Sequence, residues 1–217
     1  MDRWTPDRYW EAIAAERARL LVDLDHLGPR DWSAPTLCGT WTVEEVVAHL
    51  TAAASTGRWR WLRSIVRARF DADRHNERRL AEHRGATPAE TLARFESVVR
   101  SRVAPTGDLW AWLGEVVVHA TDIRVPLGLT AEPAADAVVA VAHGYARKDL
   151  AVRSRSTAQG LRLVATDSEF RAGHGPVVEG TTLDLVLAMA GRTAAVGRLA
   201  GEGAPLLAAA TPRAANR

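Results

Sequence analysis

Glu115 and His119 stand four residues apart in a segment with helical periodicity. At about 100° per residue, their side chains project about 40° apart on one face of a helix. That face is largely apolar, with Val116 and Ile123 beside it. Because burying an ionised carboxylate without a partner costs several kcal/mol, the pair needs a partner. A divalent metal would supply it, and an i, i+4 pair commonly offers a metal two ligands.

His49 is a third candidate ligand, on another predicted helix. It lies at the edge of an apolar stripe formed by Val43, Val46, Val47 and Leu50. Three protein ligands from facing helices, with water in the fourth place, give the open geometry of a catalytic zinc site. A plainer interpretation also fits: an exposed, hydrogen-bonded Glu/His pair and a core-edge histidine bonded to a neighbour. Spacing alone leaves both interpretations open.

The segments that would position these side chains predict helices over the first two thirds of the chain. A hydroxyl residue followed by proline, or by glutamate three residues later, marks three helix starts: Thr5-Pro6, Thr42 with Glu45, and Thr87-Pro88. The predicted helices cover about residues 5–27, 42–70, 87–105 and 108–124. Four helices joined by modest loops predict a bundle.

The pattern changes in the last third of the chain. One more helix is predicted over 133–150, and residues 161–166 alternate as a strand does. Short strands are predicted at 170–172 and 176–179, a helix at 181–191, and a further strand in the tail at 199–210. We therefore predict an α+β, mainly α chain with a helical bundle at 1–150, a small α/β domain at 151–210 and a frayed tail at 211–217.

Composition excludes several functional classes. The formal charge of +2 is too small to indicate nucleic-acid binding, and the arginines of residues 58–84 alternate with acidic residues, as on a solvated face. No apolar run is long enough to span a membrane, and the first residues lack a signal-peptide pattern, so a cytoplasmic location is expected. Cys38, the single cysteine, excludes an internal disulfide and is expected to be a small buried apolar residue rather than a nucleophile.

Two blocks of sequence resemble a known family. Leu37-Cys38-Gly39-Thr40-Trp41-Thr42-Val43, running into Val46-Val47-Ala48-His49-Leu50, is similar to the signature of the mycothiol-dependent maleylpyruvate isomerase-like proteins. The segment from Gly114-Glu115 through His119-Ala120-Thr121-Asp122 to Gly128 resembles the second metal-ligand block of that family. A third match runs from Leu163 to Arg192. The resemblance extends over nearly the whole chain.

The resemblance implies a DinB-like metal-binding four-helix bundle followed by a small sterol-carrier-like α/β domain. It implies that His49, Glu115 and His119 ligate a divalent metal, expected to be zinc, and that mycothiol, an actinobacterial thiol, is the co-substrate. In the family, the thiolate adds to a substrate double bond, and rotation and thiol release then give the isomer. Two arginines are candidates for binding substrate carboxylates, Arg78 and Arg192.

Three functional hypotheses follow. The first is a metal-dependent enzyme, an isomerase or thiol S-transferase that uses mycothiol and a small electrophile and acts as a monomer or homodimer. The second is a metal-stabilised binding or regulatory module without turnover. The third is a structural bundle in which Glu115 and His119 face solvent. Metal content measured together with thiol binding separates the three.

Overall fold

A computed structural model of the chain describes residues 4–55, 82–150 and 152–211. By its internal contacts the chain divides into two compact units. The first comprises Met1–Thr36 and Thr40–Glu132, and the second comprises Leu37–Gly39 and Pro133–Arg217. This division lies upstream of 150/151 because the helix that follows Pro133 packs within the second unit. The predicted domains, a helical bundle at 1–150 and a small α/β domain at 151–210, stay a prediction.

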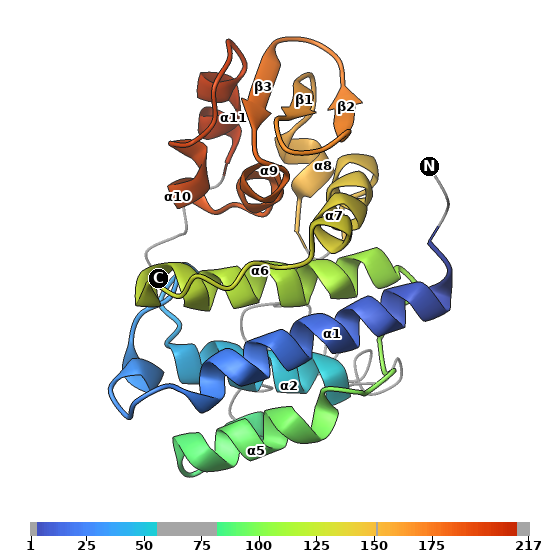
Figure 1. Cartoon of the computed structure of the whole chain (residues 1–217). Coiled ribbons are helices and arrows are strands. Elements are labelled where there is room, and N and C mark those ends of the chain that lie inside the picture. Colours follow the sequence, from blue (N-terminus) through green and yellow to red (C-terminus); the bar gives the residue numbers. More distant parts are fainter. Residues whose placement is uncertain (1–3, 56–81, 151, 212–217) are drawn as a thin grey trace, which may run out of the picture. The chain divides into compact units, whose positions relative to one another are not determined.

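Four helices build the first unit in the part of the chain that the structure describes (Figure 1). They are α1 (Pro6–Asp25), α2 (Val43–Ser55), α5 (Pro88–Val98) and α6 (Leu109–Leu127), with a short 3-10 turn, η1 (Asp31–Ser33), before α2. Helix α1 packs against α5 and α6, and α2 packs against the same two helices. The four therefore close around an apolar centre that includes Ile13, Leu20, Val47, Leu50, Phe95, Leu113 and Val117. The predicted bundle is confirmed; the continuation of the second helix to about residue 70 lies outside the described residues.

Hydroxyl side chains fix where three of these helices begin. Before α1, Oγ1 of Thr5 accepts from the amide of Arg8 at 3.2 Å. The amide of Thr42 donates to Oε2 of Glu45 at 2.8 Å, and the amide of Glu45 donates to Oγ1 of Thr42 at 3.4 Å. This is the predicted capping box, which satisfies two amides that the helix itself leaves unpaired. Before α5, Oγ1 of Thr87 accepts from the amide of Glu90 at 3.3 Å. The box fixes the start of α2 at Val43, six residues before His49.

A buried carboxylate joins α2 to α5. Oε1 of Glu44 accepts from the hydroxyl of Thr91 at 3.0 Å, and Oε2 accepts from Nε of Arg84 at 2.9 Å. Thr91 is fully buried and Glu44 is 7% exposed. Arg84 is the member of the arginine-rich segment that lies within the described residues. Its guanidinium is half exposed, yet it pairs with Glu44 rather than facing only solvent.

We expect Glu44→Ala to lower the free energy of unfolding by about 2–3 kcal/mol, because hydrogen bonds to a charged group are lost and the buried Thr91 hydroxyl keeps only the more distant carbonyl of Thr87 as acceptor. Arg84→Gln should cost less than about 1 kcal/mol, since the exposed side of an ion pair contributes little. Urea unfolding of both variants measures the difference. Equal losses in the two variants would contradict a network centred on Glu44.

The second unit is a small sheet covered by helices. Its elements are α7 (Ala135–Arg147), α8 (Ser154–Thr157), β1 (Arg162–Ala165), β2 (Arg171–Gly173), β3 (Val177–Gly180), α9 (Thr182–Met189), α10 (Thr193–Val196) and α11 (Ala204–Ala210). The strand order is β2-β1-β3, with β1 antiparallel to β2 and parallel to β3. Helix α9 packs on β1, β3 and α7. Buried side chains of the unit include Leu163, Phe170, Val178, Leu185, Leu187 and Met189. The predicted α+β, mainly α class is confirmed.

Two glycines allow the chain to pass close to β1 between β2 and β3. Gly173 has φ 74° and Gly175 has φ 113°. A Cβ atom would lie 2.2 Å from the carbonyl oxygen of Leu161 at the first position, and equally close to that of Gly160 at the second. Only glycine combines this backbone conformation with such an approach.

The predicted strand over the tail is wrong. Ala200 forms a single bridge with Glu179, and residues Ala204–Ala210 are helical. Pro205 lies in the first turn of that helix, where its missing amide costs nothing, and the alanines that follow are the strongest helix formers. Leu207 is fully buried, so the helix packs one apolar side chain against the unit.

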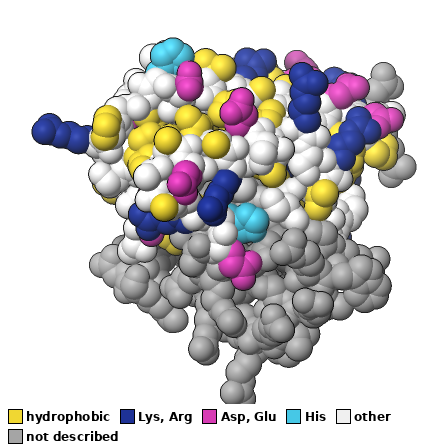
Figure 2. Space-filling model, turned by 90° about the horizontal axis from the view of Figure 1, so that it is seen from below, with side chains coloured by type: hydrophobic (Ala, Val, Ile, Leu, Met, Phe, Trp, Pro, Cys, Tyr) yellow, Lys and Arg dark blue, Asp and Glu magenta, His cyan; other side chains and the backbone are white. Residues whose placement is uncertain are grey.

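The described surface carries mixed charge. Figure 2 shows arginine and lysine side chains interspersed with aspartate and glutamate on the face it presents, without a continuous patch of one sign among the described residues. Among the helices that the structure describes, none is both long enough and apolar enough to cross a membrane.

Candidate metal centre

The first unit brings His49, Glu115 and His119 together. Nε2 of His49, on α2, lies 2.5 Å from Oε1 of Glu115, on α6. Nε2 of His119 lies 3.6 Å from the same oxygen. The side chains are 14%, 19% and 9% exposed, respectively, so the cluster is mostly withdrawn from solvent. This arrangement contradicts the third hypothesis, a structural bundle in which Glu115 and His119 face solvent.

The two imidazoles hold Glu115 in its ionised form. Burial alone would raise the pKa of the Glu115 carboxyl, but the hydrogen bonds and positive charge of His119 and His49 outweigh burial. That pKa therefore lies well below its ordinary value. At neutral pH the cluster offers a carboxylate beside two imidazoles, a donor set of oxygen and nitrogen that suits zinc and other first-row divalent ions.

Asp122 fixes the orientation of His119. Its Oδ2 accepts a hydrogen bond from Nδ1 of His119 at 3.0 Å, and Asp122 is fully buried one turn further along α6. With a proton on Nδ1, loss of the other ring proton leaves the lone pair on Nε2, the nitrogen that faces Glu115 and would bind a metal. A histidine that ligates a metal almost always donates its other ring N–H in this way. The spacing of His119 and Asp122, three apart, could have indicated this role from the sequence.

Trp41 packs against both histidines. Its ring centroid lies 4.9 Å from that of His49 and 6.4 Å from that of His119. The backbone carbonyl of Trp41 accepts from the amide and the hydroxyl of Thr36, which secures the turn before α2. No sequence pattern assigns this role to Trp41, because it depends on how the turn folds back over the bundle.

The arrangement fits a metal ion. One ligand atom from each of the three residues lies within 4.8 Å of the others. Ligand atoms around a tetrahedral zinc, each about 2.0–2.1 Å from the ion, are separated by roughly 3.3 Å. Small side-chain movements would therefore let the three atoms share one ion, with the proton between His49 and Glu115 displaced. The buried carboxylate–imidazole pair at Asp122 and His119 is a second feature typical of metal sites.

We expect Asp122→Asn to weaken zinc affinity by about 10–100-fold, the usual cost of losing an outer-shell partner of a ligating histidine. The amide is close in size to the carboxylate but makes His119 less basic. Zinc dissociation constants, measured by competition with a chelating dye, provide the check, with the exposed Asp25→Asn as the matched control. Unchanged zinc affinity in Asp122→Asn would remove Asp122 from the site.

Comparison with known proteins gives a family. Residues 13–108 match the family described as the mycothiol maleylpyruvate isomerase N-terminal domain. Those residues belong to this family. The resemblance inferred from the sequence is confirmed. The matched segment includes His49 and Trp41 and ends before Glu115 and His119. The inclusion of Glu115 and His119 in the site therefore depends on their distances in the structure.

Solved structures agree on the fold of this isomerase family. The crystal structure of the mycothiol-dependent maleylpyruvate isomerase has a TM-score of 0.62 and 16% sequence identity, over 93% of this chain and 94% of that chain. A variant of that isomerase with one histidine replaced by alanine has a TM-score of 0.61 and 15% identity over the same shares. At this identity the likeness shows the fold alone. No curated protein matches the sequence of this chain.

The remaining candidates lie elsewhere. Arg78 lies outside the described residues. Arg192 follows α9 in the second unit, where its Nη1 donates to the carbonyl of Ala190 at 2.8 Å and its Nη2 lies 3.7 Å from Sγ of Cys38. Cys38 is partly exposed rather than buried as expected. A role for Arg78 or Arg192 in binding substrate therefore stays a prediction.

Proposed function

We propose that this protein is a metal-dependent, mycothiol-using enzyme that adds the thiol to a small electrophile, as an isomerase or a thiol S-transferase. The observation that carries the proposal is the cluster of His49, Glu115 and His119, with Asp122 behind it. The N-terminal family match supports mycothiol as the thiol.

The three side chains would hold one divalent ion, which we propose is zinc. When bound, such an ion binds a thiol at its open position and lowers the pKa of that thiol, so that the nucleophilic thiolate is present at neutral pH. Glu115 contributes one negative charge, because its pKa lies well below neutrality. Two neutral imidazoles and one carboxylate leave a net charge of about +1, which a single thiolate neutralises.

The residues around the cluster orient it and limit the access of water. Asp122 keeps the lone pair of His119 on Nε2. The Trp41 ring lies against both imidazoles and restricts their rotation. Because the ligands come from two packed helices, their spacing depends on the rigidity of the bundle rather than on a loop.

The proposed chemistry balances without an oxidant or reductant. The thiolate sulfur adds to the β-carbon of a conjugated double bond, and the electron pair of that bond moves onto the carbonyl oxygen as an enolate. Rotation about the new single bond, followed by return of the electron pair and loss of the thiolate, gives an isomer. Protonation of the enolate instead gives a stable thioether, the product of an S-transferase. Arg78 and Arg192 are the proposed ligands for substrate carboxylates.

Turnover with mycothiol tests the proposal. Zinc-loaded protein is incubated with maleylpyruvate, and separately with a simple enone, with and without mycothiol, and the products are followed by NMR. We expect cis-to-trans isomerisation or thioether formation that requires mycothiol and is lost in Glu115→Gln. Binding of mycothiol without turnover of either compound would favour a metal-stabilised binding or regulatory module instead.

A further inference from the structure

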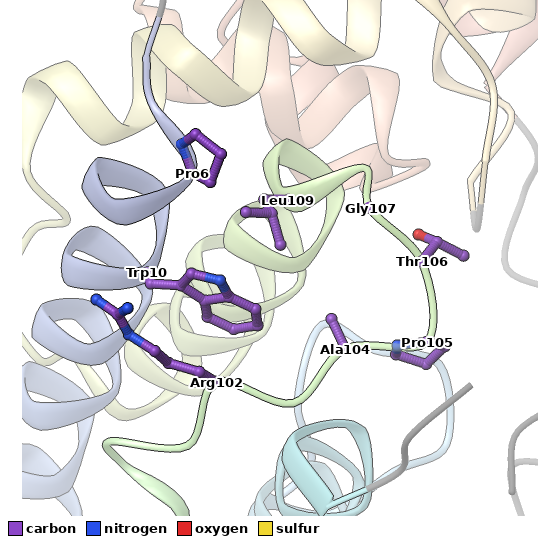
Figure 3. Close-up of a pocket in the computed structure, with 8 residues that line it drawn as sticks. All are labelled: Pro6, Trp10, Arg102, Ala104, Pro105, Thr106, Gly107 and Leu109. Atoms are coloured by element: carbon purple, nitrogen blue, oxygen red, sulfur yellow. The ribbon is translucent and has the colours of Figure 1, made fainter. Parts of the chain in front are cut away.

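The bundle contains a hollow that the proposed chemistry does not use. It has a volume of about 640 Å³ and lies between the first turns of α1 and α6 and the loop that joins α5 to α6. Figure 3 shows the ring of Trp10 lying across it, among Pro6, Leu109 and Ala104. Arg102, Pro105, Thr106 and Gly107 complete the lining. None of the lining residues belongs to the metal cluster.

The lining is that of a small-molecule site. Such sites have volumes of about 300–1,000 Å³ and combine apolar walls with a few polar groups. Here the indole of Trp10 offers a broad flat face, and two prolines, Ala104 and Leu109 supply apolar walls. A flat ring stacks well on such a face. The body of the ligand is therefore apolar and planar.

The polar side chains of the lining indicate the sign of the ligand's charge. Among the described residues that line the hollow, these are Arg102 and Thr106, and none of them is acidic. The hydroxyl of Thr106 accepts from Nε1 of Trp112 at 3.3 Å, which leaves its own proton to donate. Arg102 has donors only. Because Arg102 is a cation and the Thr106 hydroxyl has a proton to donate, the hollow favours an anion, and a carboxylate matches the planar fork of a guanidinium.

Arg102 already binds a carboxylate, that of Asp7. Its Nη1 donates to Oδ1 of Asp7 at 2.9 Å, with both side chains more than half exposed. Exposed ion pairs of this kind contribute little to stability. A ligand carboxylate that also stacks on Trp10 can therefore replace Asp7 on the guanidinium at small cost.

We propose that this hollow binds a planar aromatic carboxylate, with its ring on Trp10 and its carboxylate at Arg102 and Thr106. The site is independent of the metal cluster and of the proposed function. Asp7 competes for the same guanidinium and sets how tightly the ligand is held.

The test uses 2-naphthoate as the probe and the full chain in equilibrium dialysis. We expect saturable binding to the metal-free and the zinc-loaded protein alike. Arg102→Gln should weaken binding by about 5–10-fold, since a hydrogen bond to a charged group is lost. Asp7→Asn should strengthen binding, because the competing carboxylate is removed. Arg100→Gln, an exposed arginine outside the lining, is the matched control.

Two further measurements keep the result unambiguous. Trp10→Leu should weaken binding by about tenfold, with circular dichroism to check that it folds. The neutral 2-naphthalenemethanol should bind more weakly than 2-naphthoate. Absence of binding, equal binding of acid and alcohol, equal binding by wild type and Arg102→Gln, or binding only to the zinc-loaded protein would each overturn the proposal.

Discussion

His119→Ala is expected to purify without metal, whereas the wild-type protein carries about one divalent ion per chain. The substitution removes one of three ligands and leaves Glu115 with a single imidazole partner, His49. We expect the loss of zinc affinity to exceed about 100-fold, the upper end of the effect of losing an outer-shell partner such as Asp122. Elemental analysis after purification without chelators measures the metal content directly.

The matched control is His174→Ala, which removes an exposed histidine of the second unit. It should keep the metal content of the wild type. Circular dichroism of both variants separates loss of metal from loss of fold, because an unfolded chain would lose its helical signal as well. If folded His119→Ala still holds one ion per chain, the ligand set of His49, Glu115 and His119 is wrong.

The same ligand set predicts the direction of the pH dependence. An imidazole must be neutral to bind a metal, and its ordinary pKa is about 6.5. The low pKa of the Glu115 carboxyl keeps it ionised well below that pH. Metal should therefore be held above the ordinary range of imidazole titration and released as the pH falls through it.

Local features of this fold could be read from the sequence, because short signals determine them. The capping box of Thr42 and Glu45 needs only two residues and the helix between them. The i, i+4 spacing of Glu115 and His119 places both on one face of any helix that contains them. The tail is helical for a local reason too, because the alanines after Pro205 are strong helix formers and the proline stands in the first turn.

Features that depend on tertiary structure were harder to predict. That His49 on α2 meets Glu115 on α6 follows from how the helices cross, and the family resemblance rather than spacing indicated it. Trp41 contacts both histidines only because the turn held by Thr36 folds back. Trp10 shows no pattern that distinguishes it from a core tryptophan, and the hollow appears only when α1, α6 and their neighbouring loop come together.

Mycothiol is expected to bind the zinc-loaded protein and not the metal-free protein. The reason is charge. With Glu115 ionised and both imidazoles neutral, the metal site carries about +1 and favours a thiol in its anionic form. A free thiol has a pKa of about 8.5, so lowering it by about two units makes most of the bound thiol a thiolate at pH 7. Without the ion that charge is absent, and the carboxylate of Glu115 repels a thiolate.

Calorimetry with mycothiol on the two forms measures this difference, and a thiol-free analogue of mycothiol is the matched ligand control. We expect the analogue to bind both forms equally and weakly. Proton release on binding of mycothiol, measured in buffers of different ionisation enthalpy, should approach one per thiol, because the thiol loses its proton in the site.

Cys38→Ala tests whether the reacting sulfur belongs to mycothiol or to the protein. Cys38 is the single cysteine and is partly exposed, so it is the protein's one alternative source of a reacting sulfur. If the reacting sulfur belongs to mycothiol, Cys38→Ala keeps most of the mycothiol binding and most of the activity towards any electrophile that the wild type consumes. Loss of turnover in folded, zinc-loaded Cys38→Ala would place the reacting sulfur on the protein. Equal binding of mycothiol to both metal states would instead separate the thiol from the metal and leave a binding module as the better interpretation of the cluster.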